Sequence, residues 1–335
     1  MSDTNSIQTL SGDIGGTKTR LAVVEVCGNR VRIEREASYP SRDYALFETL
    51  LGDFLSGVEI PVHAAFGIAG PVQGRVVQTT NLPWRIDADA LQRQFGFARC
   101  TLLNDLEATA YGLAALGADD LLTLQLGMPG ASGNTAVIAA GTGLGEAGLF
   151  WDGQRHQPFA TEGGHASFSP GNELEIAFLC YLQQQHRHVS WERVASGMGL
   201  PGMYEFMCAH RAAATPQWLA EEMRSGDAAA AISQAALSGR DEICLETLNW
   251  FVRLYGAEAG NLALKVMSRG GIYIGGGIAP KILPLLQEGA FIEAFLNKGR
   301  MRPLLEAMPV KVILNDRAAL FGPALRAAQL ANGAI

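Results

Sequence analysis

Apolar runs separated by glycine-rich or polar breaks organise the first third of the chain. Residues 7–39, IQTLSGDIGGTKTRLAVVEVCGNRVRIEREASY, predict three strands, the first ending in a glycine-rich turn and the other two joined by a tight hairpin at Gly28-Asn29. VHAAFGIAGPV and CTLLND predict two further strands, on either side of the helix DADALQRQFG with Asp87 at its start. Between these groups, SRDYALFETLLGDFLSG predicts a helix that opens on a cap-like Ser41 and carries one apolar stripe: Leu46, Phe47, Leu50, Leu51, Phe54 and Leu55.

A similar pattern opens the second region of the chain. Residues 134–162, NTAVIAAGTGLGEAGLFWDGQRHQPFATE, predict a strand, a glycine-rich turn, a second strand, an Asp152-Gly153 hairpin and a third strand. This order and spacing echo residues 8–38, although few residues are identical, and such an echo predicts two related domains. Helical stretches follow at about 172–187, 191–212, 215–224 and 241–268, then the strand and glycine turn GIYIGGGIAP and the capped helix NDRAALFGPALRAAQL. The chain is therefore expected to be of the α/β class.

Composition and charge narrow the class of protein. The 335 residues are enough for two domains with separate cores, and 48% hydrophobic with 18% charged residues is typical of a globular protein. A formal net charge of −7 argues against nucleic acid or an anionic membrane as the main partner. The N-terminus does not resemble a signal peptide and no apolar run approaches the ~18 residues of a membrane helix, so a cytoplasmic location is expected. The cysteines form neither a C-x-x-C pair nor a Cys/His cluster, which argues against a disulfide framework or a structural zinc site.

Three glycine clusters each follow a short apolar strand: GDIGGTKT (residues 12–19), AAGTGLG (139–145) and IGGGIAPK (274–281). Glycine allows successive backbone N–H groups to face one concavity and allows a phosphate to come close. None of the clusters matches the Walker A motif, and GTGLGE carries Glu146 where a dinucleotide fingerprint needs glycine. One such cluster would be weak evidence, because a tight turn explains it. Three of them, two in matching places of the internal echo, favour phosphate binding.

Two polar residues of the first cluster allow alternative interpretations. Asp13 can brace its own turn, or it can hold hydrated magnesium near nucleotide phosphates, because Mg²⁺ prefers few carboxylates together with water and phosphate oxygens. Lys18 could contact a phosphate, but an exposed lysine of a β-ribbon is the favoured interpretation.

The segment LLNDLEATAYG (102–112) runs from an apolar strand through Asn104-Asp105 into a helical pattern. Asn104 can cap that helix while Glu107 reaches back, a variant of the capping box. Asp105 would then lie in the first turn, where the helix dipole favours negative charge. Alternatively, the pair is a catalytic base beside a substrate-orienting amide, at the carboxyl end of a strand, where open α/β sheets bind ligands.

With the glycine clusters, the repeated strand pattern and LLNDLEATA, the sequence resembles the sugar kinases of the actin/hexokinase superfamily, and more narrowly the bacterial glucokinase family. The resemblance extends over essentially the whole chain, and its most specific blocks are TEGGHASFSP (161–170) and SWERVASG (190–197). GGTKT is closer to the related repressor/open-reading-frame/kinase group. That group usually carries a cysteine-rich zinc motif near its sugar histidine, and no such motif follows His165, which favours the zinc-free glucokinases.

The resemblance implies two actin/ribonuclease-H-like domains flanking a cleft, the second with additional helices. Residues 1–115 with 316–335 would form the small domain and residues 116–315 the large one. Asp105 would be the catalytic base, and the sugar would bind to Asn104, Glu162, His165 and Glu192. The nucleotide and its phosphates would bind to the three clusters, at Asp13, Gly15, Gly16, Thr17, Gly141, Thr142, Gly143, Gly276 and Gly277. ATP and Mg²⁺ are the implied cofactors, with Asp13 holding the metal through water, and the family tends to form homodimers.

The chemistry of these residues agrees with a sugar site. Hexose hydroxyls donate and accept hydrogen bonds, so carboxylates, an amide and an imidazole suit them, and the glycines of EGGH allow Glu162 and His165 to be presented together. Taken singly, His165 is better explained as a half-buried structural histidine and Glu192 as a first-turn glutamate after a Ser190 cap. Their combination with Asn104-Asp105 and the three turns predicts ATP-dependent phosphorylation of glucose at its 6-hydroxyl.

Three alternatives stay open at this point. The substrate could be another hexose or an amino sugar, such as mannose, fructose or an N-acetyl sugar, because the sequence does not rank epimers. A non-catalytic sugar-binding regulator would need a DNA-binding segment, whereas the first strand is predicted close to the N-terminus of an acidic chain. An actin- or chaperone-like ATPase would not need the sugar-type cluster at 162–165.

Overall fold

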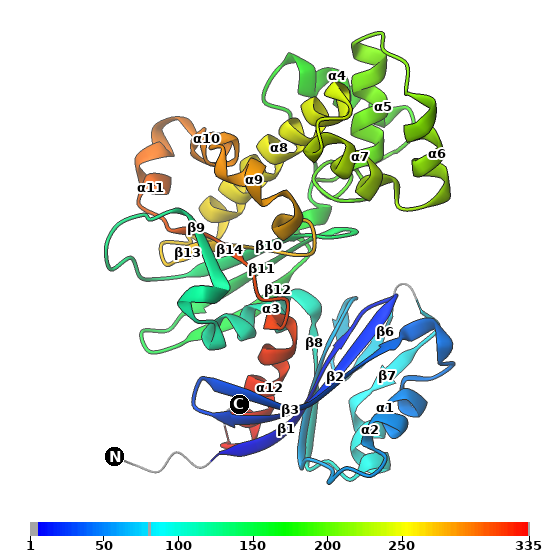
Figure 1. Cartoon of the computed structure of the whole chain (residues 1–335). Coiled ribbons are helices and arrows are strands. Elements are labelled where there is room, and N and C mark those ends of the chain that lie inside the picture. The colour runs from blue at the N-terminus through cyan, green and yellow to red at the C-terminus, as the bar shows by residue number, and fades with distance from the viewer. Residues whose placement is uncertain (1–5, 80–81, 334–335) are drawn as a thin grey trace. The chain divides into compact units, whose positions relative to one another are not determined.

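The computed structural model describes residues 6–79 and 82–333, and the chain divides into two compact units (Figure 1). The first unit contains residues 1–120, 157–160 and 315–335, and the second contains residues 121–156 and 161–314. One main β-sheet lies at the centre of each unit, and helices pack on it.

The sheet of the first unit has the strand order β3-β2-β1-β4-β8. β1 pairs antiparallel with β2 and parallel with β4, and β8 extends the sheet in parallel with β4. The predicted strands and the hairpin at Gly28, with a φ of 60°, are confirmed. The strands are β1 (Ile7–Ile14), β2 (Lys18–Cys27), β3 (Arg30–Pro40), β4 (His63–Ile68) and β8 (Arg99–Asn104).

Side chains alternate along β2 and bury both faces of this sheet. Leu21 and Val23 join the core that contains α1, whereas Ala22 and Val24 join the core that contains α12. Figure 1 shows α12, in red, beside β1 of the same sheet. Asp87 caps α2 as predicted, accepting hydrogen bonds from two N–H groups of its first turn. The helices are α1 (Phe47–Leu55), α2 (Ala88–Phe95), α3 (Asp105–Gly112) and α12 (Ala318–Ala331).

The helix predicted from Ser41 begins later than expected. Residues Ser41–Asp43 form one 3-10 turn, and α1 starts at Phe47 without a side-chain cap. The buried Ser41 hydroxyl instead donates to the Gly15 carbonyl at 2.8 Å, because the returning chain lies against the first glycine turn. Leu46 is exposed, whereas the rest of the predicted apolar stripe is buried.

The sheet of the second unit has the order β12-β11-β10-β13-β14-β9. β10 pairs antiparallel with β11 and parallel with β13, and β14 extends the parallel part. Five of its strands thus repeat the order of the first sheet, as expected of two ribonuclease-H-like units, and β9 adds an antiparallel edge. The strands are β9 (Leu121–Gln125), β10 (Thr135–Ala140), β11 (Leu144–Trp151), β12 (His156–Thr161), β13 (Gly271–Gly275) and β14 (Val310–Ile313).

The 25-residue helix α8 is the centre of the helical part of this unit. It contacts α5, α7, α10 and the strand β10, and its buried side chains join one large core with them (Figure 1). The helices are α4 (Glu173–Gln183), α5 (Leu200–His210), α6 (Gln217–Ser225), α7 (Ala228–Leu237), α8 (Glu242–Val266), α9 (Leu283–Gln287), α10 (Ala290–Leu296) and α11 (Arg302–Glu306).

The helix predicted at 191–212 is wrong in its first part, because α5 begins only at Leu200. The preceding residues hydrogen-bond to a distant segment instead of forming a helical ladder. The Trp191 N–H donates to the Ala166 carbonyl at 3.0 Å, and the Glu192 N–H donates to the Gly164 carbonyl at 2.8 Å. These bonds tie the WERVASG block to the EGGH block.

Candidate active site

The carboxyl ends of the parallel strands in the first unit bring two predicted motifs to one edge. In the register of β1, β4 and β8, Ile14 pairs with Ile68, and Ile68 pairs with Asn104. The first glycine turn therefore begins at the same level of the sheet as Asn104-Asp105. This edge is where open α/β sheets bind ligands.

Asn104 and Asp105 start α3 as the capping interpretation requires. The Asn104 side-chain oxygen accepts from the N–H of Leu106 at 2.9 Å and from that of Glu107 at 3.4 Å. Burial raises the pKa of Glu107, and the Asn104 N–H bound to its carboxylate and the charge of Arg326 partly oppose this shift. The capping box is therefore confirmed. Asp105 lies in the first turn, where the helix dipole favours acidic residues.

Asp13 is held by an ion pair with Arg20 of the neighbouring strand. The Arg20 Nη2 lies 3.0 Å from Asp13 Oδ2, and its Nη1 lies 2.8 Å from the carboxylate of Asp316. Burial lowers the pKa of Arg20, but the two carboxylates outweigh it and the net shift is upward. Asp13 is thus fixed near the end of β1, where only Ile14 separates it from Gly15, Gly16 and Thr17.

The first glycine turn is closed by hydrogen bonds. The Gly15 N–H donates to the Lys18 carbonyl at 3.0 Å, and the Ser41 N–H donates to the Thr17 carbonyl at 3.0 Å. Lys18 is exposed at the start of β2, in agreement with its favoured interpretation.

The other two glycine turns lie side by side in the second unit. They follow β10 and β13, which are parallel neighbours with Ala139 opposite Gly275. Gly276 has a φ of 83°, and a Cβ there would overlap the Ala140 carbonyl, so glycine is required at this close approach. The Gly197 N–H donates to the Gly141 carbonyl at 2.8 Å, which ties the WERVASG block to the second turn.

Three predicted sugar-binding side chains come together in the second unit. His165 Nε2 lies 3.8 Å from Glu162 Oε2, and His165 Nδ1 lies 3.8 Å from Glu192 Oε1. The side chains of His165 and Glu162 are 61% and 65% exposed, and that of Glu192 is 20% exposed, so the imidazole and both carboxylates are accessible to a ligand. A charged or polar triad of this kind suits a polyhydroxylated substrate.

Glu192 also contacts the phosphate-type turn. Its Oε2 accepts from the Leu144 N–H at 3.1 Å. A Cβ on Gly143 would overlap that same carboxylate. One carboxylate therefore connects the sugar-type cluster with the end of the turn 141–143.

The predicted residues divide between the two units. Asp13, Gly15, Gly16, Thr17, Asn104 and Asp105 belong to the first, and Gly141, Thr142, Gly143, Glu162, His165, Glu192, Gly276 and Gly277 belong to the second. The sequence did not reveal the environment of Glu146, a buried carboxyl against Gly163. Its signal was a lone charged residue in an otherwise apolar strand.

The donor set allows only one form of metal site. In residues 6–79 and 82–333 no group of three or more His, Cys, Asp or Glu side chains could hold a metal ion. The single carboxylate of Asp13 beside a phosphate-type turn fits Mg²⁺, which binds few carboxylates and completes its shell with water and phosphate oxygens. The five cysteines all lie in the described residues, and none of them forms a disulfide. No helix in the described part of the chain is long and apolar enough to span a membrane.

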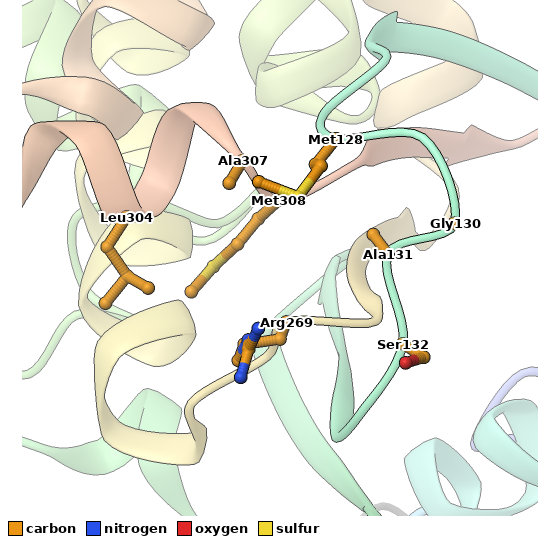
Figure 2. Close-up of a pocket in the computed structure, with 8 residues that line it drawn as sticks. All are labelled: Met128, Gly130, Ala131, Ser132, Arg269, Leu304, Ala307 and Met308. Carbon is orange, nitrogen blue, oxygen red and sulfur yellow. The ribbon is translucent and has the colours of Figure 1, made fainter.

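A pocket in the second unit lies at the opposite ends of the strands. Its lining residues Arg269 and Met308 precede β13 and β14, so it faces the amino ends of the parallel strands (Figure 2). No predicted site residue lines this pocket, and ligands of such sheets bind at the carboxyl ends. The lining residues are Met128, Gly130, Ala131, Ser132, Arg269, Leu304, Ala307 and Met308.

Comparison with known proteins identifies the family of the chain. The family model for Glucokinase matches residues 10–330. The chain is 44% identical over 337 residues to a glucokinase of Nostoc punctiforme, covering 96% of this chain and 99% of that protein. The crystal structure of a glucokinase from an Antarctic psychrotroph matches with a TM-score of 0.84 and 32% identity, covering 96% of this chain and 99% of that one. A glucokinase of the repressor/open-reading-frame/kinase family from Streptomyces griseus, solved with glucose and AMPPNP, shares the fold with a TM-score of 0.66 and 24% identity, covering 96% and 99% of the two chains. The chain belongs to the glucokinase family.

Proposed function

We propose that this protein transfers the γ-phosphoryl group of ATP to the 6-hydroxyl of glucose. The observation that carries the proposal is Glu192, whose carboxylate lies beside the imidazole of His165 and also accepts from the N–H that follows Gly143. A hexose ligand and a phosphate ligand would therefore lie next to each other. Membership of the glucokinase family and the solved relative with glucose and AMPPNP support the choice of both ligands.

The roles of the residues follow from their chemistry. Glu162, His165, Glu192 and the Asn104 amide bind sugar hydroxyls. The glycine turns at 15–17, 141–143 and 276–277 provide backbone N–H groups for the nucleotide and its phosphates. Because buried polar groups are costly when unpaired, such a site also rejects analogues that lack a hydroxyl.

Asp105 is the catalytic base in this proposal. The sugar O6 forms a bond to the γ-phosphorus while the bond from that phosphorus to the bridging oxygen of ADP breaks, and the O6 proton passes to the Asp105 carboxylate. Phosphoryl transfer has a loose transition state, so positioning and charge neutralisation supply most of the rate. The base need not be strong, because the proton leaves late, when the bond to phosphorus is loose.

The finer features of the enzyme are also part of the proposal. Asp13 would hold Mg²⁺ through water, and the ion would neutralise charge on the phosphates. Chelation with EDTA is expected to abolish turnover, and added Mg²⁺ to restore it. The two units would form domains flanking a cleft, and the enzyme would act as a homodimer in the cytoplasm. Size-exclusion chromatography with light scattering tests the dimer, and a mass of one 35.7 kDa chain would exclude it.

The experiment for the proposed function is Asp105→Ala in a coupled assay of ADP release. We expect kcat to fall by ~10²–10⁴, since that is the usual contribution of a general base. The affinity for glucose, measured by calorimetry without nucleotide, is expected to change much less. Thr109→Ala is a control in the same helix, because its hydroxyl donates to the backbone carbonyl of Asp105 at 3.0 Å and its removal leaves the carboxylate in place. If Asp105→Ala has the kcat of the wild type, Asp105 is not the catalytic base.

A panel of sugars in the same assay tests the identity of the substrate. We expect glucose to give the highest kcat/KM among glucose, mannose, fructose and N-acetylglucosamine. If another sugar has a higher kcat/KM, that sugar is the substrate, and the protein is still a sugar kinase. No sugar-dependent turnover would indicate a regulator, and sugar-independent hydrolysis would indicate an ATPase.

A further inference from the structure

Two buried carboxyl groups lie in the second unit, and one of them contacts the EGGH block (162–165) of the proposed sugar site. Glu146 on β11 is 2% exposed, and Glu258 on α8 is 0% exposed. The catalytic proposal uses neither of them. A buried ionised carboxylate is costly unless cations or N–H donors compensate its charge, so the partners of each group decide which one is charged.

Glu258 has the partners of a carboxylate. Its Oε2 accepts from the Asn261 amide at 2.7 Å, and its Oε1 accepts from the Lys265 ammonium at 3.1 Å. Lys298 adds positive charge nearby. Burial lowers the pKa of Lys298, and Glu258 opposes that shift. Both oxygens of Glu258 thus have donors, which is what a buried carboxylate requires.

Glu146 has the surroundings of a neutral acid. Its Oε1 has no hydrogen-bond partner among the described residues, and its carboxyl interacts with Glu258. Burial and the negative charge of Glu258 raise the pKa of Glu146 to about 8, and Lys265 only partly opposes them. Tyr255 of α8 interacts electrostatically with Glu146, but burial raises the pKa of that phenol, so it stays neutral, and its hydroxyl bonds to the backbone of Ile138 and Ala140. On the side of the sugar segment, the titratable groups are Glu162 and His165.

The carboxyl of Glu146 lies directly against the EGGH block. A Cβ on Gly163 would overlap Glu146 Oε2, so the missing side chain of Gly163 makes room for this carboxyl. The backbone carbonyl of Glu146 also accepts from the Thr161 hydroxyl at 3.0 Å. Gly163 begins the 3-10 turn Gly163–His165, so a movement of the Glu146 carboxyl would be transmitted to His165.

We propose that Glu146 is a positioning residue for hexose binding, whose neutral carboxyl supports the turn Gly163–His165 and whose ionisation displaces that turn. The inference rests on the proposed function of Glu162, His165 and Glu192 as sugar ligands. The ionised form would place a second negative charge beside Glu258 without a donor for Oε1. Glu146 Oε2 lies against the partly exposed Gly163, so a carboxylate that moves towards water on this side would displace the EGGH block.

The direction of the pH effect follows from the raised pKa. Below about pH 8 the carboxyl is neutral and the turn is held. If only the neutral form binds sugar, the apparent affinity falls in proportion to the neutral fraction, so the KM for glucose should rise about tenfold between pH 7 and pH 9. The KM for ATP should change much less.

Glu146→Gln tests the proposal, because the amide keeps the shape of the neutral acid and cannot ionise. We expect its KM for glucose to match that of the wild type at pH 7 and to stay flat up to pH 9. Glu146→Ala should raise this KM already at pH 7, because it removes the support. Glu242→Gln, at an exposed position of α8, should keep the wild-type profile.

The failure of this inference can be told apart from failure of the proposed function. The role of Glu146 would be overturned if the KM for glucose rose equally with pH in the wild type and in Glu146→Gln. It would also be overturned if Glu146→Ala had the wild-type KM at pH 7. If neither the wild type nor any variant turns over glucose, the proposed function fails. The inference about Glu146 is then tested by measuring glucose affinity with calorimetry at pH 7 and pH 9. An affinity that falls with pH in the wild type but not in Glu146→Gln supports the inference, whereas parallel behaviour or no binding of glucose overturns it.

Discussion

Gly143 lies where the phosphate-type turn meets the sugar-type cluster. Its backbone does not require glycine, since its φ is not positive, but a Cβ there would overlap the carboxylate of Glu192. A carboxylate at the end of a flexible side chain can move aside at little cost to the fold. The function of this glycine is therefore best tested through ligand binding and not through stability.

Gly143→Ala is expected to weaken glucose binding. Displacing Glu192 removes its bond to the Leu144 N–H, and bonds to charged groups contribute about 1.5–3 kcal/mol, so the loss should be about tenfold or more. Calorimetry without nucleotide measures it. Gly141→Ala is the matched control, because a Cβ there meets nothing within 4 Å, and its glucose affinity should be unchanged. Equal affinities of the two variants would contradict the role given to Gly143.

Single residues were predictable where their role depends on near neighbours. The capping box of Asn104 and Glu107 is confirmed because both partners lie within three positions of each other. Glu146 was noticed only as a misfit to a dinucleotide fingerprint. Its environment depends on Glu258, which a different element supplies, and no local pattern reveals such a pairing.

At the scale of elements, α3 and α12 approach each other through glycines. A Cβ on Gly322 of α12 would overlap the Ala108 carbonyl of α3, and a Cβ on Gly112 of α3 would overlap the Ala318 carbonyl of α12. Backbone atoms of both helices would have to move to accommodate a side chain. Since α3 begins with Asp105, this helix pair also determines where the proposed base lies.

Gly322→Ala should therefore destabilise the first unit and slow the reaction. Overpacking typically costs about 1–3 kcal/mol, and separation of α3 from α12 should lower kcat as well. Gly52→Ala in α1 is the control: its Cβ meets nothing within 4 Å, so higher helix propensity should leave stability unchanged or raise it by up to ~1 kcal/mol. Urea unfolding compares the two. A midpoint for Gly322→Ala at or above the wild-type value would disprove the close-approach argument.

Elements with a regular apolar period were predictable, and those defined by distant partners were not. The strands around the first two glycine turns follow from alternation, whereas β5 (Val72–Gln73), β6 (Val76–Gln78) and β7 (Arg85–Asp87) are too short to show a period. The segment before Leu200 has a helical pattern, but hydrogen bonds to Gly164 and Ala166 override it. Ser41 likewise bonds to Gly15 instead of capping a helix.

At the scale of the whole molecule, the repeated sheet explains how the functional residues are distributed. Each unit presents the carboxyl ends of its parallel strands, and each carries glycine turns there. The first unit contributes the proposed base, and the second contributes most of the proposed sugar ligands. The internal echo in the sequence predicted this duplication, because the two regions share the order of strands and glycine turns although few of their residues are identical.

This division predicts that glucose draws the two units together. In the proposed function the base belongs to the first unit and most sugar ligands belong to the second, and a phosphoryl group reaches the sugar and not water only when the site excludes water. We expect the radius of gyration in small-angle X-ray scattering to fall when glucose saturates the protein, and ATP hydrolysis without glucose to be slow. Glu192→Ala is the control, because it should lose glucose affinity and keep the sugar-free radius at the same glucose concentration. If the wild type binds glucose by calorimetry while its radius stays constant, closure is not part of the mechanism.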